Sequence, residues 1–172
     1  MSSESRAELA GSLDGELRTL VSRSVLFHQA VADRLGMNVL DLNCLGALVT
    51  AGSMPAGRLA EENSVTTGAI TGVIDRLEAA GYVRRDRDPN DRRRVLVTPL
   101  PGVEAQIFPL FESLAASMAE LCEQFSDKEL KTVLRFMSAA APIPREEAMK
   151  LRAGAPPKTA ARRARSPRPS GT

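Results

Sequence analysis

The hydrophobic period of this chain changes from helical to alternating at Gly81, and this change restricts the possible folds more than any other feature. Before the glycine, four aliphatic residues between positions 70 and 77 recur at spacings of three and four, the period of an amphipathic helix. After it, short alternating stretches flank the residues Asp-Pro-Asn-Asp at 88–91, which favour a tight turn. The sequence therefore predicts a helix followed directly by a β-hairpin.

A shorter helix is expected before this pair, over residues 55–62, because Pro55 suits the first turn of a helix. Residues 63–65 then make a turn, and Thr66 is a candidate N-cap for the helix over 66–80. Two helices joined by such a short turn predict a helix-turn-helix, and the hairpin beside it predicts a wing.

Longer helices are predicted on both sides of this unit. Residues 7–35 carry one apolar stripe that stops at Gly36, and a second helix is expected over 39–51. After the wing, residues 103–125 have a nearly heptad apolar spacing, with Pro109 weakening or bending the first turn.

Ser126 or Asp127 can cap a last helix that runs to about residue 140. The pair Pro142 and Pro144 is expected to end regular structure soon afterwards. The predicted fold class is mainly α: a winged helix-turn-helix domain, with three helices and a β-hairpin wing, and flanking long helices that form a dimerisation region. The expected parts are a first dimerisation helix (1–36), the winged domain (37–100), C-terminal dimerisation helices (101–141) and a disordered basic tail (145–172).

The net charge of +2 conceals an uneven distribution along the chain. Residues 1–149 hold 16 Lys and Arg against 21 Asp and Glu, whereas residues 150–172 hold seven basic residues and no acid. The tail has no apolar period, so it cannot bury enough surface to offset its ordering entropy, and it is predicted to be disordered. It is expected either to hold phosphates without regard to sequence or to act only as a solubilising extension.

Several classes of protein are excluded by composition and pattern. No apolar run approaches the ~18–20 residues of a membrane-spanning helix, and the polar amino terminus lacks the layout of a secretory signal. The chain has two cysteines, not arranged as CxxC, and one histidine, which disfavours disulfide frameworks, metal sites and acid–base triads. We expect a soluble, cytoplasmic protein that is not an enzyme and has no cofactor, no metal and no membrane partner.

The helix over 66–80 is the candidate recognition element. Small hydroxyl residues and glycines would let its backbone approach the major groove closely, while the alternative is an ordinary surface helix of poor propensity. The residues expected to contact DNA from this helix are Thr66, Thr67, Gly68, Thr71, Gly72, Asp75 and Arg76.

The hairpin places Arg92, Arg93 and Arg94 beside its tip. Arginine enters narrow, electronegative minor grooves and also pairs with phosphates, so these three are expected to contact DNA. Asp88 and Asp91 lie among them and are expected to form ion pairs that shape the loop. A solvated charged turn with no binding role is the alternative.

The block 58–97 resembles the MarR (multiple-antibiotic-resistance regulator) family of bacterial winged-helix repressors. The family's dRLE–xxG–yVrR pattern falls at 75–85, and its D-P-x-D-R-R wing falls at 88–93. The resemblance covers about residues 13–140. Two departures are a glycine at 72, where the family often has a long basic residue, and Thr-Pro-Leu-Pro-Gly at 98–102 in place of L-T-x-x-G.

The resemblance implies a homodimer that binds double-stranded DNA at a pseudo-palindromic operator, with the recognition helix in the major groove and Arg92 and Arg93 in the adjacent minor groove. Asp75 and Arg76 would help to fix the wing and the backbone contacts. It also implies release by a small anionic or phenolic effector, and a place at the bacterial nucleoid. The candidate effector-binding residues are His28, Met37 and Cys44.

Two other readings of the sequence lead to different mechanisms. Cys44 and Cys122 would make the chain a thiol-based redox sensor, although buried, inert cysteine is the better reading of both. Alternatively, the basic tail would dominate and make the chain a nonspecific DNA-binding protein.

Overall fold

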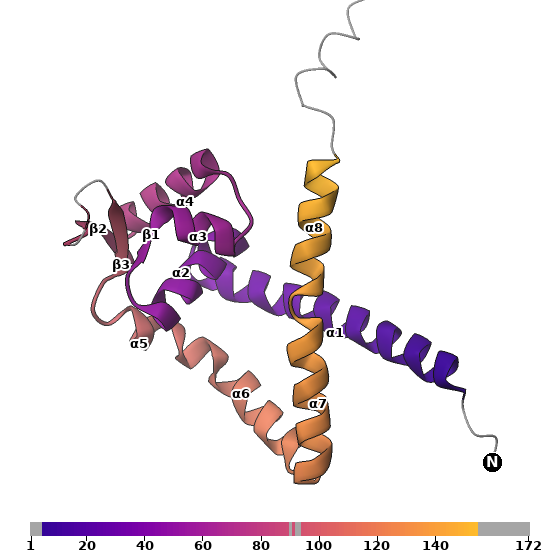
Figure 1. Cartoon of the computed structure of the whole chain (residues 1–172). Helices are drawn as coiled ribbons and strands as arrows, with labels where there is room; N and C mark the ends of the chain where they lie inside the picture. Colours follow the sequence, from indigo (N-terminus) through magenta and orange to yellow (C-terminus); the bar gives the residue numbers. More distant parts are fainter. Residues whose placement is uncertain (1–4, 90, 92–93, 155–172) are drawn as a thin grey trace, which may run out of the picture. The chain divides into compact units, whose positions relative to one another are not determined.

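The computed structural model describes residues 5–89, 91 and 94–154 (Figure 1). These described residues divide into two compact units between Ala116 and Ser117. The first unit begins with α1 (Arg6–Arg34), whose start is fixed by a capping box between Ser5 and Glu8. The chain leaves this helix through Gly36, whose φ of 68° suits glycine. The helix predicted over 7–35 is confirmed within a residue at each end.

The second helix, α2 (Val39–Ala51), has the bounds that the sequence predicts. Its N-cap is Asn38, whose side chain accepts a hydrogen bond of 2.9 Å from the backbone N–H of Asp41. Gly52, with φ of 78°, turns the chain away from the helix. Most of α2 is apolar, yet Asp41 is buried in its first turn.

The helix-turn-helix consists of α3 (Ala56–Glu62) and α4 (Thr67–Ala79). In the turn, Ser64 adopts a left-handed φ of 53°, and the N–H of Val65 donates to the carbonyl of Ala60 at 2.9 Å. Thr66 caps α4 as predicted, because its hydroxyl accepts from the N–H of Ala69 at 3.2 Å.

A small antiparallel sheet follows, with the strand order β1-β3-β2. The predicted hairpin is β2 (Val83–Arg87) and β3 (Val95–Pro99). β1 (Met54–Pro55) was not predicted, because Pro55 was expected inside the first turn of α3; it is instead the N-cap of that helix and pairs with Leu96. Proline is tolerated here because β1 is an edge strand.

The hydrophobic core of the first unit joins α2, α3, α4 and the sheet. All of its members are almost completely shielded from solvent, and they include Leu45, Leu48, Leu59, Ile70, Val73, Ile74, Leu77, Val83 and Val97. The four aliphatic residues that predicted the amphipathic helix all lie in this core, so α4 can present only its opposite face to a partner.

The helix expected over 103–125 is two helices, α5 (Val103–Ile107) and α6 (Pro109–Cys122). Pro109 has no N–H and its ring crowds the preceding turn, so the helical hydrogen bonds are interrupted there. Phe108 nevertheless keeps helical dihedral angles, with φ of −56° and ψ of −41°. α7 (Asp127–Ala140) begins at Ser126, which forms a capping box with Glu129.

One prediction for the C-terminal segment is wrong. Pro142 and Pro144 do not end regular structure: they open α8 (Ile143–Ala153), with Pro142 as N-cap and Pro144 in the first turn, where a missing N–H costs nothing. Glu146 in the first turn and Lys150 and Arg152 in the last turn also complement the helix dipole. The predicted disordered tail therefore does not begin at 145, and its remaining part, 155–172, lies outside the described residues.

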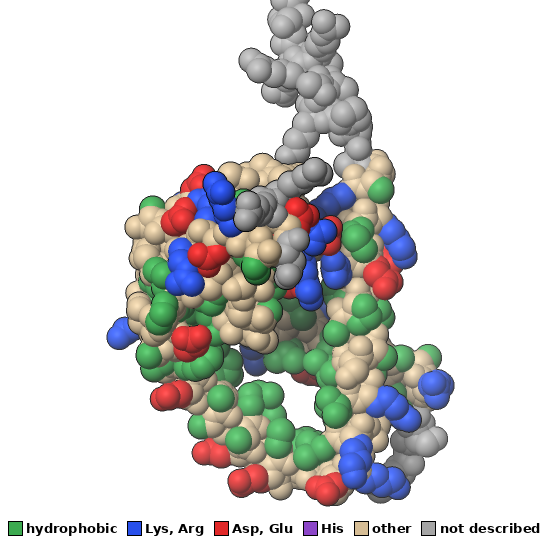
Figure 2. Space-filling view, turned by 60° about the vertical axis from the view of Figure 1, so that its left-hand side comes forward, with side chains coloured by type: hydrophobic (Ala, Val, Ile, Leu, Met, Phe, Trp, Pro, Cys, Tyr) green, Lys and Arg blue, Asp and Glu red, His purple; other side chains and the backbone are tan. Residues whose placement is uncertain are grey.

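Several helices leave large apolar side chains uncovered (Figure 2). α6 and α7 contain no buried residue, and α1 buries only Val31 and Ala32. The exposed set includes Leu13, Leu20, Leu26, Leu114, Met118, Leu121, Phe125, Val133, Leu134 and Met137. Surfaces of this kind usually mark a place where another protein surface binds. Within the described part of the chain, no helix has both the length and the apolar character that a membrane span requires.

Replacing Leu45, which is fully buried in α2, is expected to destabilise the first unit. Leu45→Ala should lower the free energy of unfolding by about 2–5 kcal/mol, because the lost contacts leave a cavity. Urea denaturation at constant protein concentration measures this. Leu151→Ala is the matched control: Leu151 is 76% exposed, so its loss should change stability by less than about 0.5 kcal/mol. Equal effects of the two variants would contradict the assigned core.

Candidate nucleic-acid interface

The outer face of α4 carries small and hydroxylic residues. Thr67, Gly68 and Thr71 are exposed, and Gly72 is partly exposed. The Thr71 hydroxyl donates to the carbonyl of Thr67 at 2.9 Å, which leaves its oxygen able to accept a further hydrogen bond. This face is therefore shallow, and it offers hydroxyl and methyl groups to any partner that approaches the helix backbone.

Neither glycine on this face is required by the fold. A Cβ at Gly68 would meet no atom within 4 Å, and one at Gly72 would lie in ordinary contact, 3.5 Å from Nη1 of Arg76. Neither residue has a positive φ. Each glycine costs the helix about 1 kcal/mol relative to alanine. Intramolecular packing does not explain that cost.

Arg76 is held by an ion pair with α2. Its Nε donates to Oδ2 of Asp41 at 2.9 Å and its Nη2 donates to Oδ1 at 2.6 Å. The Asp41 side chain is 3% exposed, whereas that of Arg76 is 52% exposed. The hydrogen bonds to Asp41 raise the pKa of Arg76 above its ordinary value, so the guanidinium keeps its charge. Arg76 therefore joins the C-terminal half of α4 to the start of α2.

A second arginine ties α4 to the wing. Arg85 on β2 donates through Nη2 to Asp75 at 2.5 Å and through Nη1 to Glu78, whose other oxygen accepts the backbone N–H of Arg85 at 3.2 Å. Hydrogen bonding to Asp75 raises the pKa of Arg85. Asp75 thus contacts the wing strand. The charge of Arg85 is largely neutralised within the chain.

The base of the wing tip is ordered by backbone and side-chain contacts. The N–H of Asp88 donates to the carbonyl of Arg94 at 3.1 Å, and the N–H of Arg94 donates to the carbonyl of Asp91 at 2.8 Å. Arg94 also pairs with the Asp91 carboxylate at 3.5 Å while 64% of its side chain stays exposed. Of the three arginines predicted to contact DNA, Arg92 and Arg93 lie outside the described residues.

The structure does not bring the predicted effector-binding residues into one site. His28 packs edge-on against Phe27 and Phe111, with ring centroids 5.9 Å away in each case, and its Nδ1 lies 2.8 Å from the carbonyl of Ser24. Met37 borders a separate open depression of about 390 Å³, whose wall includes Arg76. Cys44 is fully buried and has no surface on which to meet a ligand.

Burial also makes Cys44 a poor redox centre. Burial, together with the nearby carboxylate of Asp41, raises the pKa of the thiol to about 11. The thiolate is the reactive form, so Cys44 is inert near neutral pH. Cys122, at the end of α6, is exposed. Across residues 5–89, 91 and 94–154, no His, Cys, Asp or Glu side chains gather in a way that would hold a metal ion.

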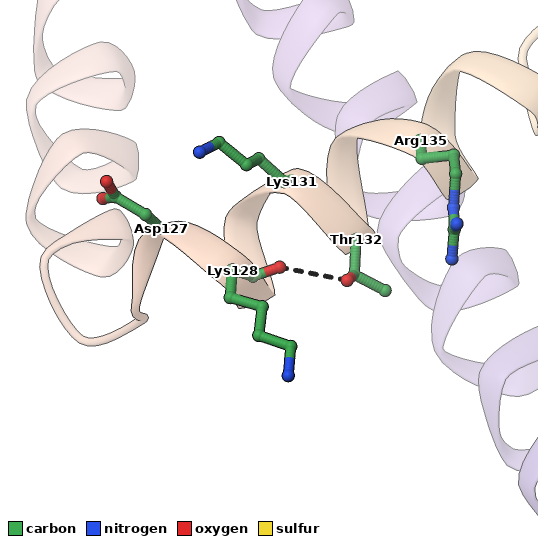
Figure 3. A pocket seen from close by; sticks show the side chains of 5 residues that line it. All are labelled: Asp127, Lys128, Lys131, Thr132 and Arg135. Atoms are coloured by element: carbon green, nitrogen blue, oxygen red, sulfur yellow. Dashed lines mark hydrogen bonds between the residues drawn. The ribbon is translucent and has the colours of Figure 1, made fainter.

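A further cationic surface lies on α7, in the second unit. Lys128, Lys131 and Arg135 border an open depression together with Asp127 and Thr132 (Figure 3). The only hydrogen bond drawn among these five residues runs from the Thr132 hydroxyl to the carbonyl of Lys128, at 3.0 Å, and is local to the helix. The three cations project from successive turns of one helix, which is typical of a solvated face.

Sequence reasoning missed Asp41, Glu78 and Arg85 as residues that position the interface. One sequence feature could have indicated the role of Asp41: it is the one charged residue in the apolar segment 39–51. A lone carboxylate on such a helix indicates a buried ion pair, although the partner, 35 positions away, is not evident from spacing.

Comparisons with known proteins identify similar sequences and similar folds. The model of the MarR family matches residues 37–95. The uncharacterized HTH-type transcriptional regulator YcgE of Bacillus subtilis (strain 168) is 43% identical over 148 residues, covering 86% of this chain and 96% of that protein. Wild-type MarR from E. coli in its apo form superimposes with a TM-score of 0.55 at 25% identity, covering 74% of this chain and 96% of that chain. RV1404 from Mycobacterium tuberculosis, at 22% identity, shares the fold with a TM-score of 0.62 over 82% of this chain and 95% of that chain.

The two thiols are expected to differ sharply in reactivity. With a pKa of about 11, roughly one Cys44 thiol in a thousand is ionised at pH 8, and the group is also shielded. The Cys122→Ser variant should therefore be alkylated slowly at pH 8, faster as the pH rises toward 11, and rapidly once unfolded. The Cys44→Ser variant, which retains the exposed Cys122, is the control. Equal alkylation rates of the two native variants at pH 8 would contradict the assignment.

Proposed function

This chain belongs to the MarR family of DNA-binding transcriptional regulators, and from that premise we propose that it is a repressor that binds a pseudo-palindromic operator as a homodimer. The observation that carries the proposal is the outer face of α4, where two glycines that the fold does not require lie beside exposed threonines. Such a face fits the major groove, where threonine can meet base edges or phosphates. The wing, with Arg94 and the neighbouring Arg92 and Arg93, would reach the adjacent minor groove.

The uncovered apolar side chains of α1, α6 and α7 support the homodimer. A second copy of the chain would cover them, and a two-fold dimer would place two α4 helices on successive major grooves, about 34–36 Å apart. The expected operator therefore has two related half-sites. In this proposal the protein acts in the bacterial cytoplasm, at the nucleoid.

Release by a small effector is the regulatory part of the proposal. His28, Phe27 and Phe111 form an aromatic cluster between α1 and α6 of the first unit. The Nδ1–H of His28 is placed to donate to the carbonyl of Ser24. This leaves Nε2 to accept from the hydroxyl of a phenol or, when it is itself protonated, to donate to an anionic group. A ligand that favours one spacing of the two recognition helices would shift the population away from the DNA-bound form.

Two alternative mechanisms are less well supported. A redox switch would have to rely on Cys122, because Cys44 is buried with a raised pKa. Loss of oxidant-induced DNA release in the Cys122→Ser variant would favour it. If instead the basic tail supplies most of the affinity for DNA, the protein should bind all DNA sequences equally well.

Specific binding is tested by selecting duplexes from a random-sequence pool with the purified protein. We expect enrichment of a two-fold-symmetric sequence over the unselected pool. The Arg92→Ala/Arg93→Ala variant should bind the enriched site at least about tenfold more weakly, because two charge-assisted contacts are lost. Mobility-shift titration measures the affinity.

The matched control for the wing variant is Lys128→Ala/Lys131→Ala, which removes two positive charges from α7 in the second unit. It should bind the enriched site about as tightly as the wild type. If nothing is enriched, the proposal of a specific repressor fails. If the wing variant binds as tightly as the wild type, the minor-groove role of the wing fails.

Removal of residues 155–172 separates the contribution of the tail, and the deletion after Gly154 keeps α8 whole. We expect a shallower dependence of log Kobs on log salt, by about 0.9 for each phosphate that the tail neutralises. The ratio of affinities for the enriched site and for random DNA should be unchanged. A truncated protein that no longer distinguishes the two DNAs would favour the tail-led alternative.

A further inference from the structure

Within the described part of the chain, the guanidinium of Arg76 has one edge engaged by Asp41 and one edge without a hydrogen-bond partner. Nε and Nη2 donate to the two oxygens of Asp41, so this edge is saturated by the carboxylate. Nη1 lies toward Gly72, at 3.5 Å from the position that a Cβ there would occupy. The Nη1 donors of Arg76 therefore lie toward the outer face of α4 at Gly72, one turn before Arg76. Thr71 is on the same face.

The Asp41 residue that holds Arg76 is itself held by two hydrogen bonds with Asn38. Asp41 accepts a hydrogen bond of 2.9 Å from the side-chain amide of Asn38, while its own backbone N–H donates to that amide's oxygen. It lies in the first turn of α2, where the helix dipole favours a negative charge. With a side-chain exposure of 3%, it has little freedom to reorient. Asp41 therefore holds the long side chain of Arg76 in one orientation, although about half of that side chain is exposed.

Glycine at position 72 completes the arrangement. The Cβ of an alanine would only touch Nη1, at 3.5 Å, but a longer side chain directed the same way would compete with the guanidinium for space. Because Gly72 has no side chain and Asp41 holds Arg76, the Arg76 guanidinium lies in a fixed orientation on the outer face of α4. Arginine held in this way loses less rotamer freedom when it binds a phosphate.

We propose that Asp41 is a positioning residue, which presents the free edge of Arg76 across Gly72 so that it donates to a DNA phosphate beside the recognition helix. This inference rests on the proposed DNA-binding function and adds to it a residue that lies buried in α2, away from the helix that contacts DNA. The contact fixes the depth and register of α4 on the duplex, because phosphate contacts position a protein while base contacts specify the sequence.

The sign of the Asp41→Asn effect separates positioning from simple electrostatics. Removal of a negative charge alone strengthens binding to any DNA. Loss of the bidentate partner releases Arg76, so positioning predicts the opposite, a loss of about tenfold or more on the enriched site. The matched control is Asp14→Asn, which breaks the exposed Arg18–Asp14 pair on α1 and so reports the effect of charge alone.

A double-mutant cycle tests whether Asp41 acts through Arg76. Arg76→Gln should weaken binding to the enriched site about tenfold and reduce the salt slope by about 1. In the Arg76→Gln background, Asp41→Asn should then change the affinity less than about twofold. An equal loss in both backgrounds, or no loss from Asp41→Asn in the wild-type background, overturns the inference. Thermal melting of each variant verifies that it is folded at the assay temperature.

Arg76→Lys decides the question if Asp41→Asn does not fold. Lysine keeps the charge but lacks the planar fork that binds both carboxylate oxygens. Positioning predicts that Arg76→Lys loses nearly as much affinity as Arg76→Gln, whereas wild-type affinity for Arg76→Lys overturns it. If the wild-type protein enriches no sequence, the proposed function fails; if it does and the cycle shows no coupling, this inference alone fails.

Discussion

Burial of one face of α4 is the constraint on which the rest of the interface depends. Ile70, Val73, Ile74 and Leu77 are all but inaccessible, and they pack with α2, α3 and the sheet. Fully burying side chains of this size contributes about 1.5–3 kcal/mol each, far more than the helix loses through its two glycines. The rotation of α4 about its axis is therefore set by the core, and the residues left outside follow from it.

Ion pairs with carboxylates then determine how much of each arginine guanidinium near α4 is exposed to a partner. Arg85 is occupied by Asp75 and Glu78, so it joins the wing to α4 and contributes little free charge. Arg76 is engaged by Asp41 through Nε and Nη2. Among the described residues, the arginines near α4 therefore differ in how much of the guanidinium is paired within the chain.

The local elements were predictable, and the contacts between them were not. The bounds of α2 and the cap at Thr66 follow from period and capping chemistry, which act within a few residues. β1 was missed because a two-residue strand exists only through its pairing with β3, which comes some forty residues later. α8 was missed because Pro142 and Pro144 are compatible with a helix start as well as with a helix end. The partners of Arg76 and Arg85 are likewise tertiary, so the candidate site was predictable as a face of a helix but not as a geometry.

The open space at Gly68 has a consequence for how this protein can change. A new side chain there would displace no atom of the chain within 4 Å, and it would raise the helix propensity of α4. Most substitutions lower stability, but replacing a glycine at a compatible helical site is one of the changes that commonly raises it. A single substitution at 68 can therefore change the outer face of α4 while the fold becomes more stable. This face is thus free to change during evolution without a compensating change in the core.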